Sequence, residues 1–317
     1  MLSNCEKIVL SINTAKPSDR RKSSGAMVMN NGKSAMTLKI RDRAFNWGER
    51  TYLMGILNVT PDSFSDGGEF NSIENARSQA KHMLENGVDI IDIGGESTRP
   101  NAKPVSIEEE LERVIPVIQK IRQESNIPIS IDTTKAIVAQ KAIAVGADIV
   151  NDISGGTFDG EMLTTVAKLN VPIILMHIRG NPKTMQSLTD YQDVVAEVME
   201  FLKTQVDKAI ACGISKSNII LDPGIGFAKT AHQSLELLQY LDRFKVLDLP
   251  MLVGVSRKSF MRPILNQDKA KDRVWGTAAA CYGAIARGAD ILRVHDVAEM
   301  YDVCRVADAI ERNFVRK

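Results

Sequence analysis

Eight apolar runs of this 317-residue sequence each end in side chains that can bind a ligand or take part in chemistry. The stretch IIDIGGESTRP, residues 90–100, passes from isoleucines through two glycines to a carboxylate, two hydroxyls and a guanidinium. The other runs end, in chain order, in Asn58, Asp132, Asn151 and Asp152, Met176 and His177, Asp222, Ser256 to Ser259, and Arg293 to His295. An Asp or Asn after a strand is often only a helix cap. So many polar ends together indicate instead that the runs share one site.

One group of these residues suits a planar heterocycle. Asp132, Asn151 and Asp222 offer acceptors and an amide, and a carboxylate can accept two parallel N–H bonds from an amino-pyrimidinone edge. Lys258 can donate to a ring carbonyl and a ring nitrogen. The residue types predict a pocket for a flat molecule with several N–H donors, although they do not identify that molecule.

A second group suits an anion together with a metal ion. Arg293 and His295 can neutralise or hydrogen-bond a phosphate. Asn58 supplies a hard oxygen, which fits Mg²⁺ better than a softer metal. A transition-metal site is less favoured because the histidines lack H-x-H or H-E-x-x-H spacing. We therefore expect a pocket divided between a heterocycle and a diphosphate.

These side chains need a framework that brings the ends of the apolar runs together. The runs predict strands near 52–58, 88–93, 128–132, 147–151, 171–176, 218–222, 249–254 and 289–293. Helical patterns lie between them, including one over 107–124 that opens with a capping box of Ser106 and Glu109. Strands that alternate with helices are typical of parallel pairing.

A local motif recurs at three of these boundaries and supports the same architecture. GVDIID at 87–92, GADIVN at 146–151 and GADILR at 288–293 each place a glycine where a helix ends and a strand begins. The alternative is a doubly wound sheet, but no strand is followed by a G-x-G-x-x-G or Walker pattern. The sequence favours a (β/α)8 TIM barrel with an N-terminal β-hairpin over 38–47, with its chemistry at the C-terminal ends of the strands.

Composition limits the other function classes. A net charge of +1 gives no broad basis for binding nucleic acid or an anionic membrane. The four cysteines lie far apart, which is typical of reduced thiols in a cytoplasmic protein. No apolar run reaches the roughly 18 residues of a transmembrane helix. Residues 1–35 are polar and aperiodic, so we expect a disordered extension followed by a single catalytic domain over 36–317.

The motifs resemble those of the dihydropteroate synthase family. GILNVTPDSFSDGG, DIGGESTRP, DTTK, NDISGG, LMH, LDPGIGF, SRKS and RVHD occur in the family's order. The resemblance implies a magnesium-dependent TIM-barrel transferase that condenses 6-hydroxymethyl-7,8-dihydropterin diphosphate with para-aminobenzoate in folate biosynthesis. The products would be 7,8-dihydropteroate and diphosphate. The family also implies a homodimer and a target of sulfonamides.

The resemblance assigns roles motif by motif. The pterin would be held by Asp132, Asn151, Asp222 and Lys258. The diphosphate and Mg²⁺ would be held by Asn58, Arg293 and His295. Further substrate-binding positions are Met176, Phe227, Ser256 and Ser259. Thr98 and Arg99 would lie on a mobile loop that closes over the second substrate. The catalytic set is therefore Asn58, Thr98, Arg99, Lys258, Arg293 and His295.

The chemistry that follows from these roles centres on departure of the diphosphate. Mg²⁺, Arg293 and His295 would neutralise the charge that grows on this leaving group. The carboxylate of para-aminobenzoate would bind at the N-terminus of a helix that opens near Ser259. The departures from the family pattern are Asn101, Ala136 and Ala228, in place of its usual glycine, proline and glycine.

Two alternatives remain at this point. A pterin-binding methyltransferase shares a related barrel, but it has no need for DIGGESTRP or for a diphosphate clamp of Arg293 and His295. A paralogue that binds a pterin without turning it over would be a binding protein rather than an enzyme. The presence of every group that the chemistry needs argues against that second alternative.

Overall fold

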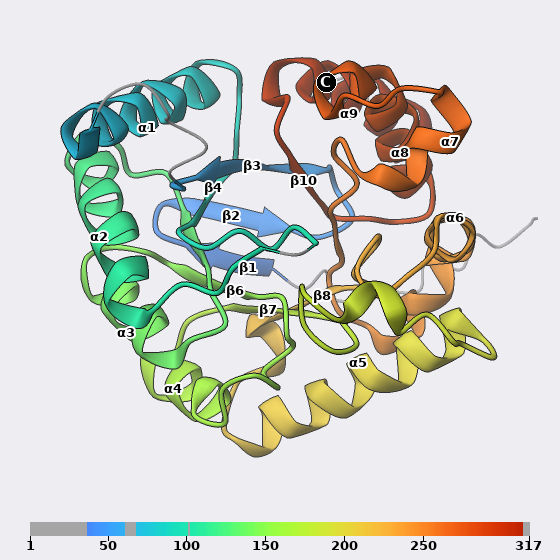
Figure 1. The fold of residues 1–317 in the computed structure, drawn as a ribbon, viewed down its shortest axis with the longest axis horizontal. Helices are drawn as coiled ribbons and strands as arrows, with labels where there is room; N and C mark the ends of the chain where they lie inside the picture. The colour runs from blue at the N-terminus through green and yellow to red at the C-terminus, as the bar shows by residue number, and fades with distance from the viewer. Residues whose placement is uncertain (1–36, 61–67, 101, 313–317) are drawn as a thin grey trace, which may run out of the picture. The chain divides into compact units, whose positions relative to one another are not determined.

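Eight parallel strands form the centre of the structure, which is a computed structural model describing residues 37–60, 68–100 and 102–312 (Figure 1). The strands are β3 Tyr52–Asn58, β4 Ile90–Gly94, β5 Ile129–Asp132, β6 Ile149–Asp152, β7 Ile173–Met176, β8 Ile219–Asp222, β9 Leu252–Val253 and β10 Ile291–Val294. They pair in the order β8-β7-β6-β5-β4-β3-β10-β9. A parallel bridge between Leu221 and Met251 joins the two outer strands and closes the barrel. The predicted (β/α)8 barrel is confirmed, and the doubly wound sheet is excluded.

The apolar runs become strands because both of their faces are covered. Every residue of β4 through β8 is buried, as expected for parallel strands between a packed barrel interior and an outer layer of helices. The strand predicted over 249–254 is shorter than expected, because only Leu252–Val253 forms a ladder. Pro250 has no N–H to donate, although its carbonyl accepts a bond from the N–H of Leu221 at 2.9 Å.

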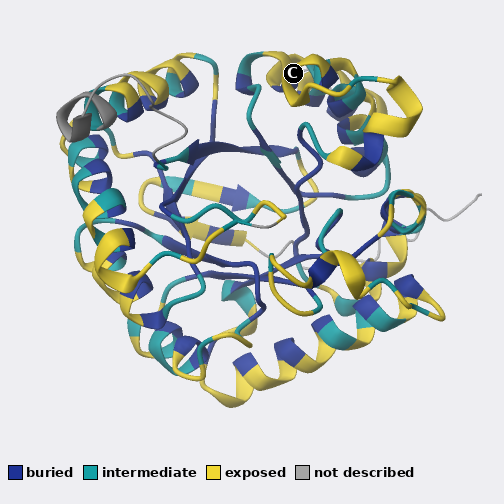
Figure 2. Cartoon of the chain, in the orientation of Figure 1, coloured by how far each residue is buried: buried dark blue, intermediate teal, exposed yellow. Residues whose placement is uncertain are grey.

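The helices surround the barrel, and all except the four-residue α7 bury one side, as the dark stripes in Figure 2 show. They are α1 Gly68–Glu85, α2 Ile107–Glu124, α3 Ala136–Ala144, α4 Met162–Leu169, α5 Val194–Ala211, α6 Ala231–Gln239, α7 Arg262–Leu265, α8 Val274–Ala286 and α9 Val297–Glu311. The repeated glycine motif works as predicted, since Gly87, Gly146 and Gly288 have φ of 81°, 119° and 95°. Within the described part of the chain, the helices are too short or too polar to traverse a lipid bilayer.

Helix α2 has the predicted bounds, but its cap differs from the prediction in one respect. The Oγ atom of Ser106 accepts a hydrogen bond from the N–H of Glu109 at 3.1 Å. The Glu109 carboxylate, which a capping box would turn back to Ser106, pairs with Arg113 instead. Arg113 in turn donates to the carbonyl of Gly95 at 2.7 Å, which ties α2 to the chain that leaves β4.

The predicted N-terminal hairpin is formed by β1 Thr37–Ile40 and β2 Arg43–Asn46. Its buried side chains Leu38, Ile40 and Phe45 belong to one apolar cluster with inward residues from the starts of the barrel strands. The hairpin therefore covers the N-terminal end of the barrel. The chain divides into Met1–Ser34 and Ala35–Lys317, and the extension expected over residues 1–35 lies outside the described residues.

Candidate active site

The strand register aligns the predicted site residues at the C-terminal end of the barrel. Asn58 pairs with Gly94, Gly94 with Asp132, and Asp132 with Asn151 across β3 to β6. On the next pair of strands, Met176 lies opposite Asp222. Because parallel strands end at the same edge, polar groups far apart in the sequence become neighbours around one opening.

A half-buried arginine connects the two predicted halves of the site. Arg293 on β10 donates from Nε to Oδ2 of Asp92 at 2.6 Å and from Nη2 to Oδ2 of Asp132 at 2.6 Å. Asp92 and Asp132 are both buried. Arg293, which we expect to bind the diphosphate, thus contacts Asp132, which we expect to bind the pterin. The diphosphate-binding and pterin-binding residues that the sequence suggested as two separate sets therefore form a single network.

Asp92 at the middle of β4 is a site residue that the sequence analysis missed. Its Oδ2 accepts from Arg293 and also from Nδ2 of Asn151 at 3.2 Å. Its Oδ1 is buried and, among the described residues, has no hydrogen-bond partner. A carboxylate inside an apolar strand is costly unless it is paired. The signal was present in IIDIG, where one Asp interrupts four apolar positions.

Burial changes the protonation of the carboxylate at the end of β5. It raises the pKa of Asp132 to about 7, and the negative charge of Asp92 adds to the rise, while Arg293 opposes it. Burial by itself lowers the pKa of Arg293, but its contacts with Asp92 and Asp132 outweigh this and raise it. Asp132 therefore exchanges a proton near neutral pH, whereas Arg293 remains charged.

The opposite wall contains Asp222, Lys258 and Phe227. The Nζ atom of Lys258 donates to the carbonyl of Ile225 and lies 4.5 Å from the centre of the Phe227 ring. Burial lowers the pKa of Lys258 to about 8, although the Asp222 carboxylate opposes the shift. Asp222 accepts from the N–H of Gly224 at 2.7 Å, and its pKa is raised, chiefly by burial. Asp222 is buried, whereas Lys258 and Phe227 are half-buried.

His295 follows β10 and is held by Ser256. Its Nδ1 lies 2.9 Å from the Ser256 Oγ, which also accepts from the His295 backbone N–H at 3.1 Å. Burial and the charges of Arg257 and Arg293 lower the pKa of His295 to about 4. Arg99 contributes to the same shift, so its charge also acts at this point. His295 is neutral at pH 7, which favours hydrogen bonding over the charge neutralisation expected from the sequence.

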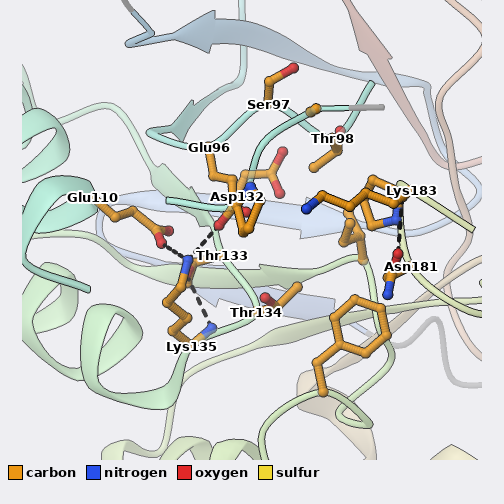
Figure 3. Close-up of a pocket in the computed structure, with 15 residues that line it drawn as sticks. Glu96, Ser97, Thr98, Glu110, Asp132, Thr133, Thr134, Lys135, Asn181 and Lys183 are labelled. Atoms are coloured by element: carbon orange, nitrogen blue, oxygen red, sulfur yellow. Dashed lines mark hydrogen bonds and ion pairs between the residues drawn. The ribbon is translucent and has the colours of Figure 1, made fainter. Parts of the chain in front are cut away.

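A cavity of about 310 Å³ lies beside Asp132, under the chain that leaves β4 (Figure 3). Thr98 lines it, together with residues of the segments that follow β5, β6 and β7. At one side, the ammonium of Lys135 lies between the carboxylates of Glu96 and Glu110. The base of the 96–105 segment is thus held by ionic contacts that the sequence analysis did not identify.

Other predicted positions have structural contexts of different kinds. Met176 is buried in a small apolar cluster beside Phe227. The helix expected at Ser259 is a 3-10 turn, Ser259–Met261, that leads into the four-residue α7. So short an element aligns few peptide dipoles, so the helix dipole alone is a weak basis for the anion site expected there, and that site stays a prediction. Asn101 lies outside the described residues.

Comparison with known proteins agrees with this geometry. A family model described as "Pterin binding enzyme" matches residues 54–295. A dihydropteroate synthase from Synechocystis is 60% identical over 87% of this chain and 95% of its own length. The structure of Xanthomonas albilineans dihydropteroate synthase with 4-aminobenzoic acid is 41% identical, with a TM-score of 0.83, over 89% of this chain and 100% of the other.

A third relative is also a solved structure. Yersinia pestis dihydropteroate synthase in a sulfonamide complex is 41% identical, with a TM-score of 0.81, over 86% of this chain and 98% of the other. The relatives are synthases, so the methyltransferase alternative finds no support. The chain belongs to the dihydropteroate synthase family of pterin-binding enzymes and is a transferase of folate biosynthesis.

Proposed function

We propose that the buried polar groups at the barrel opening perform the dihydropteroate synthase reaction in the following way. Asp132, Asn151, Asp222 and Lys258 bind the pterin ring through its N–H, carbonyl and ring-nitrogen edge. The observation that carries this assignment is the burial of Asp132, Asn151 and Asp222 at the C-terminal ends of their strands, with Lys258 following β9 at the same end of the barrel. Buried carboxylates without full pairing are costly, and the N–H donors of a pterin supply the missing partners.

Pterin binding requires an exchange of partners at Asp132. Arg293 occupies one oxygen of this carboxylate in the free protein. We propose that the ring displaces the Arg293 Nη2 group, which then turns toward the diphosphate while Nε stays on Asp92. Asp92 Oδ1 is available to accept a second bond from the guanidinium, since it has no partner among the described residues. Asp92 thus keeps Arg293 within reach of both positions.

The bond changes are those of a substitution at the pterin methylene. The amine nitrogen of para-aminobenzoate forms the new C–N bond, and the C–O bond to diphosphate breaks with its electron pair on the leaving oxygen. The amine then loses a proton to solvent. Arg293 neutralises charge on the departing group, and the neutral His295 hydrogen-bonds it. Thr98 and Arg99 act on the side of the second substrate, where they exclude water.

Magnesium fits the residues present on the diphosphate side. Asn58 ends β3, and β3 pairs directly with β10, which carries Arg293. The described residues contain no cluster of three or more His, Cys, Asp or Glu side chains suited to a metal. Mg²⁺ commonly takes few protein ligands and completes its shell with phosphate and water. When bound, it would lower the energy of the charge on the leaving diphosphate.

We further propose that the enzyme is a homodimer that uses the face of α7, α8 and α9. Trp275 on α8 is 79% exposed, and further exposed apolar side chains are Ile264 on α7, Tyr282 on α8, and Val306 and Ile310 on α9. Helices α8 and α9 pack against each other, and large apolar side chains exposed on neighbouring helices are typical of an interface. Trp275→Glu should shift the mass measured by light scattering from dimer to monomer. Ile210→Glu, on the exposed side of α5, is the matched control and should leave the dimer unchanged.

The reaction is tested by mixing the protein, Mg²⁺, the dihydropterin diphosphate and para-aminobenzoate. Equal, magnesium-dependent appearance of dihydropteroate and diphosphate would support the assignment, and a sulfonamide should compete with para-aminobenzoate. Tight binding of the pterin diphosphate with neither product would instead identify a binding paralogue. Asp222→Asn should weaken pterin binding about tenfold or more, because one charge-assisted acceptor is lost.

A further inference from the structure

The turn between β8 and α6 contains a lysine that is only 4% exposed and contacts the turn itself. We infer that Lys229 is a positioning residue, which fixes residues 223–229 and through them the Phe227 ring and the Lys258 ammonium of the active site. The inference rests on the proposed pterin site, because Phe227 and Lys258 belong to it. Lys229 itself has no direct part in the reaction.

The hydrogen bonds of Lys229 account for all three of its donors. Its Nζ donates to the carbonyl of Gly224 at 3.0 Å and to the carbonyl of Phe227 at 2.9 Å. The third contact, at 2.9 Å, is to Nδ1 of His177, at the end of β7. Burial lowers the pKa of Lys229 well below its usual value, although the Asp222 carboxylate opposes the shift. In its ammonium form Lys229 has three donors and no acceptor, so His177 then presents the lone pair of a neutral ring. Burial agrees with this, since it lowers the pKa of His177 to about 2, with help from the charge of Lys229.

These contacts enclose the part of the turn that supports Lys258. The carbonyl of Ile225 accepts from the Lys258 ammonium, and the Phe227 ring lies 4.5 Å from it. Ile225 lies between the two carbonyls that Lys229 binds, and Phe227 supplies one of them. Movement of the turn would therefore shift both groups that hold Lys258. Through this turn, Lys229 connects the end of β7 to Phe227 and Lys258 of the proposed pterin site.

The backbone of the turn is unfavourable by itself and needs the hydrogen bonds of Lys229 to stabilise it. Gly224, Gly226 and Ala228 have φ of 68°, 80° and 49°. The first two are glycines, but Ala228 pays the steric cost of a left-handed conformation. A Cβ at Gly224 would lie 2.0 Å from the His177 carbonyl oxygen, so the turn packs tightly against the end of β7. Local preference alone does not favour this backbone, and the bonds of Lys229 hold it in place.

The test replaces the ammonium and measures binding apart from turnover. Lys229→Met should raise the Kd for 6-hydroxymethyl-7,8-dihydropterin diphosphate and its KM by about tenfold, with a smaller effect on the KM for para-aminobenzoate. Hydrogen exchange of residues 223–229 should become faster. Lys203→Met, on the exposed side of α5, is the matched control and should change neither quantity. Lys229→Met/Ala228→Gly should recover part of the affinity, because glycine relieves the left-handed position.

Several outcomes would overturn the inference. Wild-type affinity and unchanged exchange of the turn in Lys229→Met would show that the turn holds without the ammonium. An equal loss of affinity for both substrates, with no rescue by Ala228→Gly, would indicate general destabilisation. If Lys229→Met does not fold, His177→Gln removes one of the three contacts, and wild-type affinity and exchange would count against the inference in the same way. Failure of the wild-type protein to bind the pterin would instead refute the proposed site, while exchange in the turn would still test Lys229.

Discussion

Arg293 and the fully buried Asp92 form an ion pair between β10 and β4, with Nε 2.6 Å from Oδ2. The same Asp92 oxygen accepts from Asn151, so one carboxylate orients the cation proposed to bind the diphosphate and the amide proposed to bind the pterin. Removing one partner of a buried pair leaves an uncompensated charge. The pair therefore links the stability of the barrel to the geometry of the active site.

The first prediction concerns that pair. Asp92→Asn should lower stability by about 3 kcal/mol, because the Arg293 charge loses a buried partner. Turnover should fall about a hundredfold as Arg293 and Asn151 lose their orientation. Thermal unfolding and steady-state kinetics measure the two effects. Asp207→Asn, on the exposed side of α5, should change neither. A stable Asp92→Asn variant with normal kinetics would remove Asp92 from the proposed site.

The raised pKa of Asp132 predicts a pH dependence of stability. In the unfolded chain the carboxyl ionises near 3.8, whereas in the folded protein burial raises its pKa to about 7. The folded state holds the proton more tightly, so the stability due to Asp132 is full below pH 3.8 and is lost as the pH rises through 7. The free energy of unfolding of wild type and of Asp132→Asn can be measured by denaturant at several pH values. The difference between them should fall as the pH rises from 3.8 to about 7. A constant difference would contradict the raised pKa.

The main features of the fold could be predicted from the sequence because they depend on local patterns. Apolar runs produced the strands, and the periodicity of residues 107–124 gave α2 its bounds. The barrel then placed Asn58, Asp132 and Asn151 at one edge. The sequence analysis did not predict that the 249–254 strand is short. Its length depends on the contacts where the barrel closes, at which the Leu221 N–H donates to the Pro250 carbonyl and Leu221 pairs with Met251.

The interactions within the site were harder to predict. Arg293 and Asp132 are 161 positions apart, and their contact depends on how side chains turn within the barrel. The neutral state of His295 depends on burial and on nearby arginines, neither of which the sequence displays. Lys135 was read as part of the DTTK motif, but its partner Glu110 lies on another helix. Such interactions can be identified only when the neighbours of each side chain in the folded protein are known.

The next prediction separates the N-terminal hairpin from the chemistry. Phe45 is buried against the inward residues at the start of the strands, so Phe45→Ala should lower the free energy of unfolding by about 3–5 kcal/mol. The site lies at the other end of the barrel, so kcat/KM should remain near wild type below the lowered Tm. Chemical denaturation and activity at low temperature measure both. A large loss of kcat/KM in the folded variant would mean that the hairpin also shapes the site.

The last prediction concerns Lys135, whose ammonium lies between Glu96 and Glu110. Lys135→Met should raise the KM for para-aminobenzoate, because Glu96 leads into the segment that carries Thr98 and Arg99. Affinity for the pterin diphosphate should change little. Stability should fall by about 3 kcal/mol, since Glu110 is buried and loses its cation.

A second substitution tests the cause of that loss. Lys135→Met/Glu110→Gln should regain much of the stability, because the buried negative charge is removed with its partner. The KM for para-aminobenzoate should stay raised, since Glu96 still lacks its ion pair with Lys135. Lys141→Met, on the exposed side of α3, serves as the matched control. If the double variant regains a wild-type KM as well, Glu110 rather than Glu96 would explain the kinetic effect, and the role of Lys135 in placing Thr98 and Arg99 would be wrong.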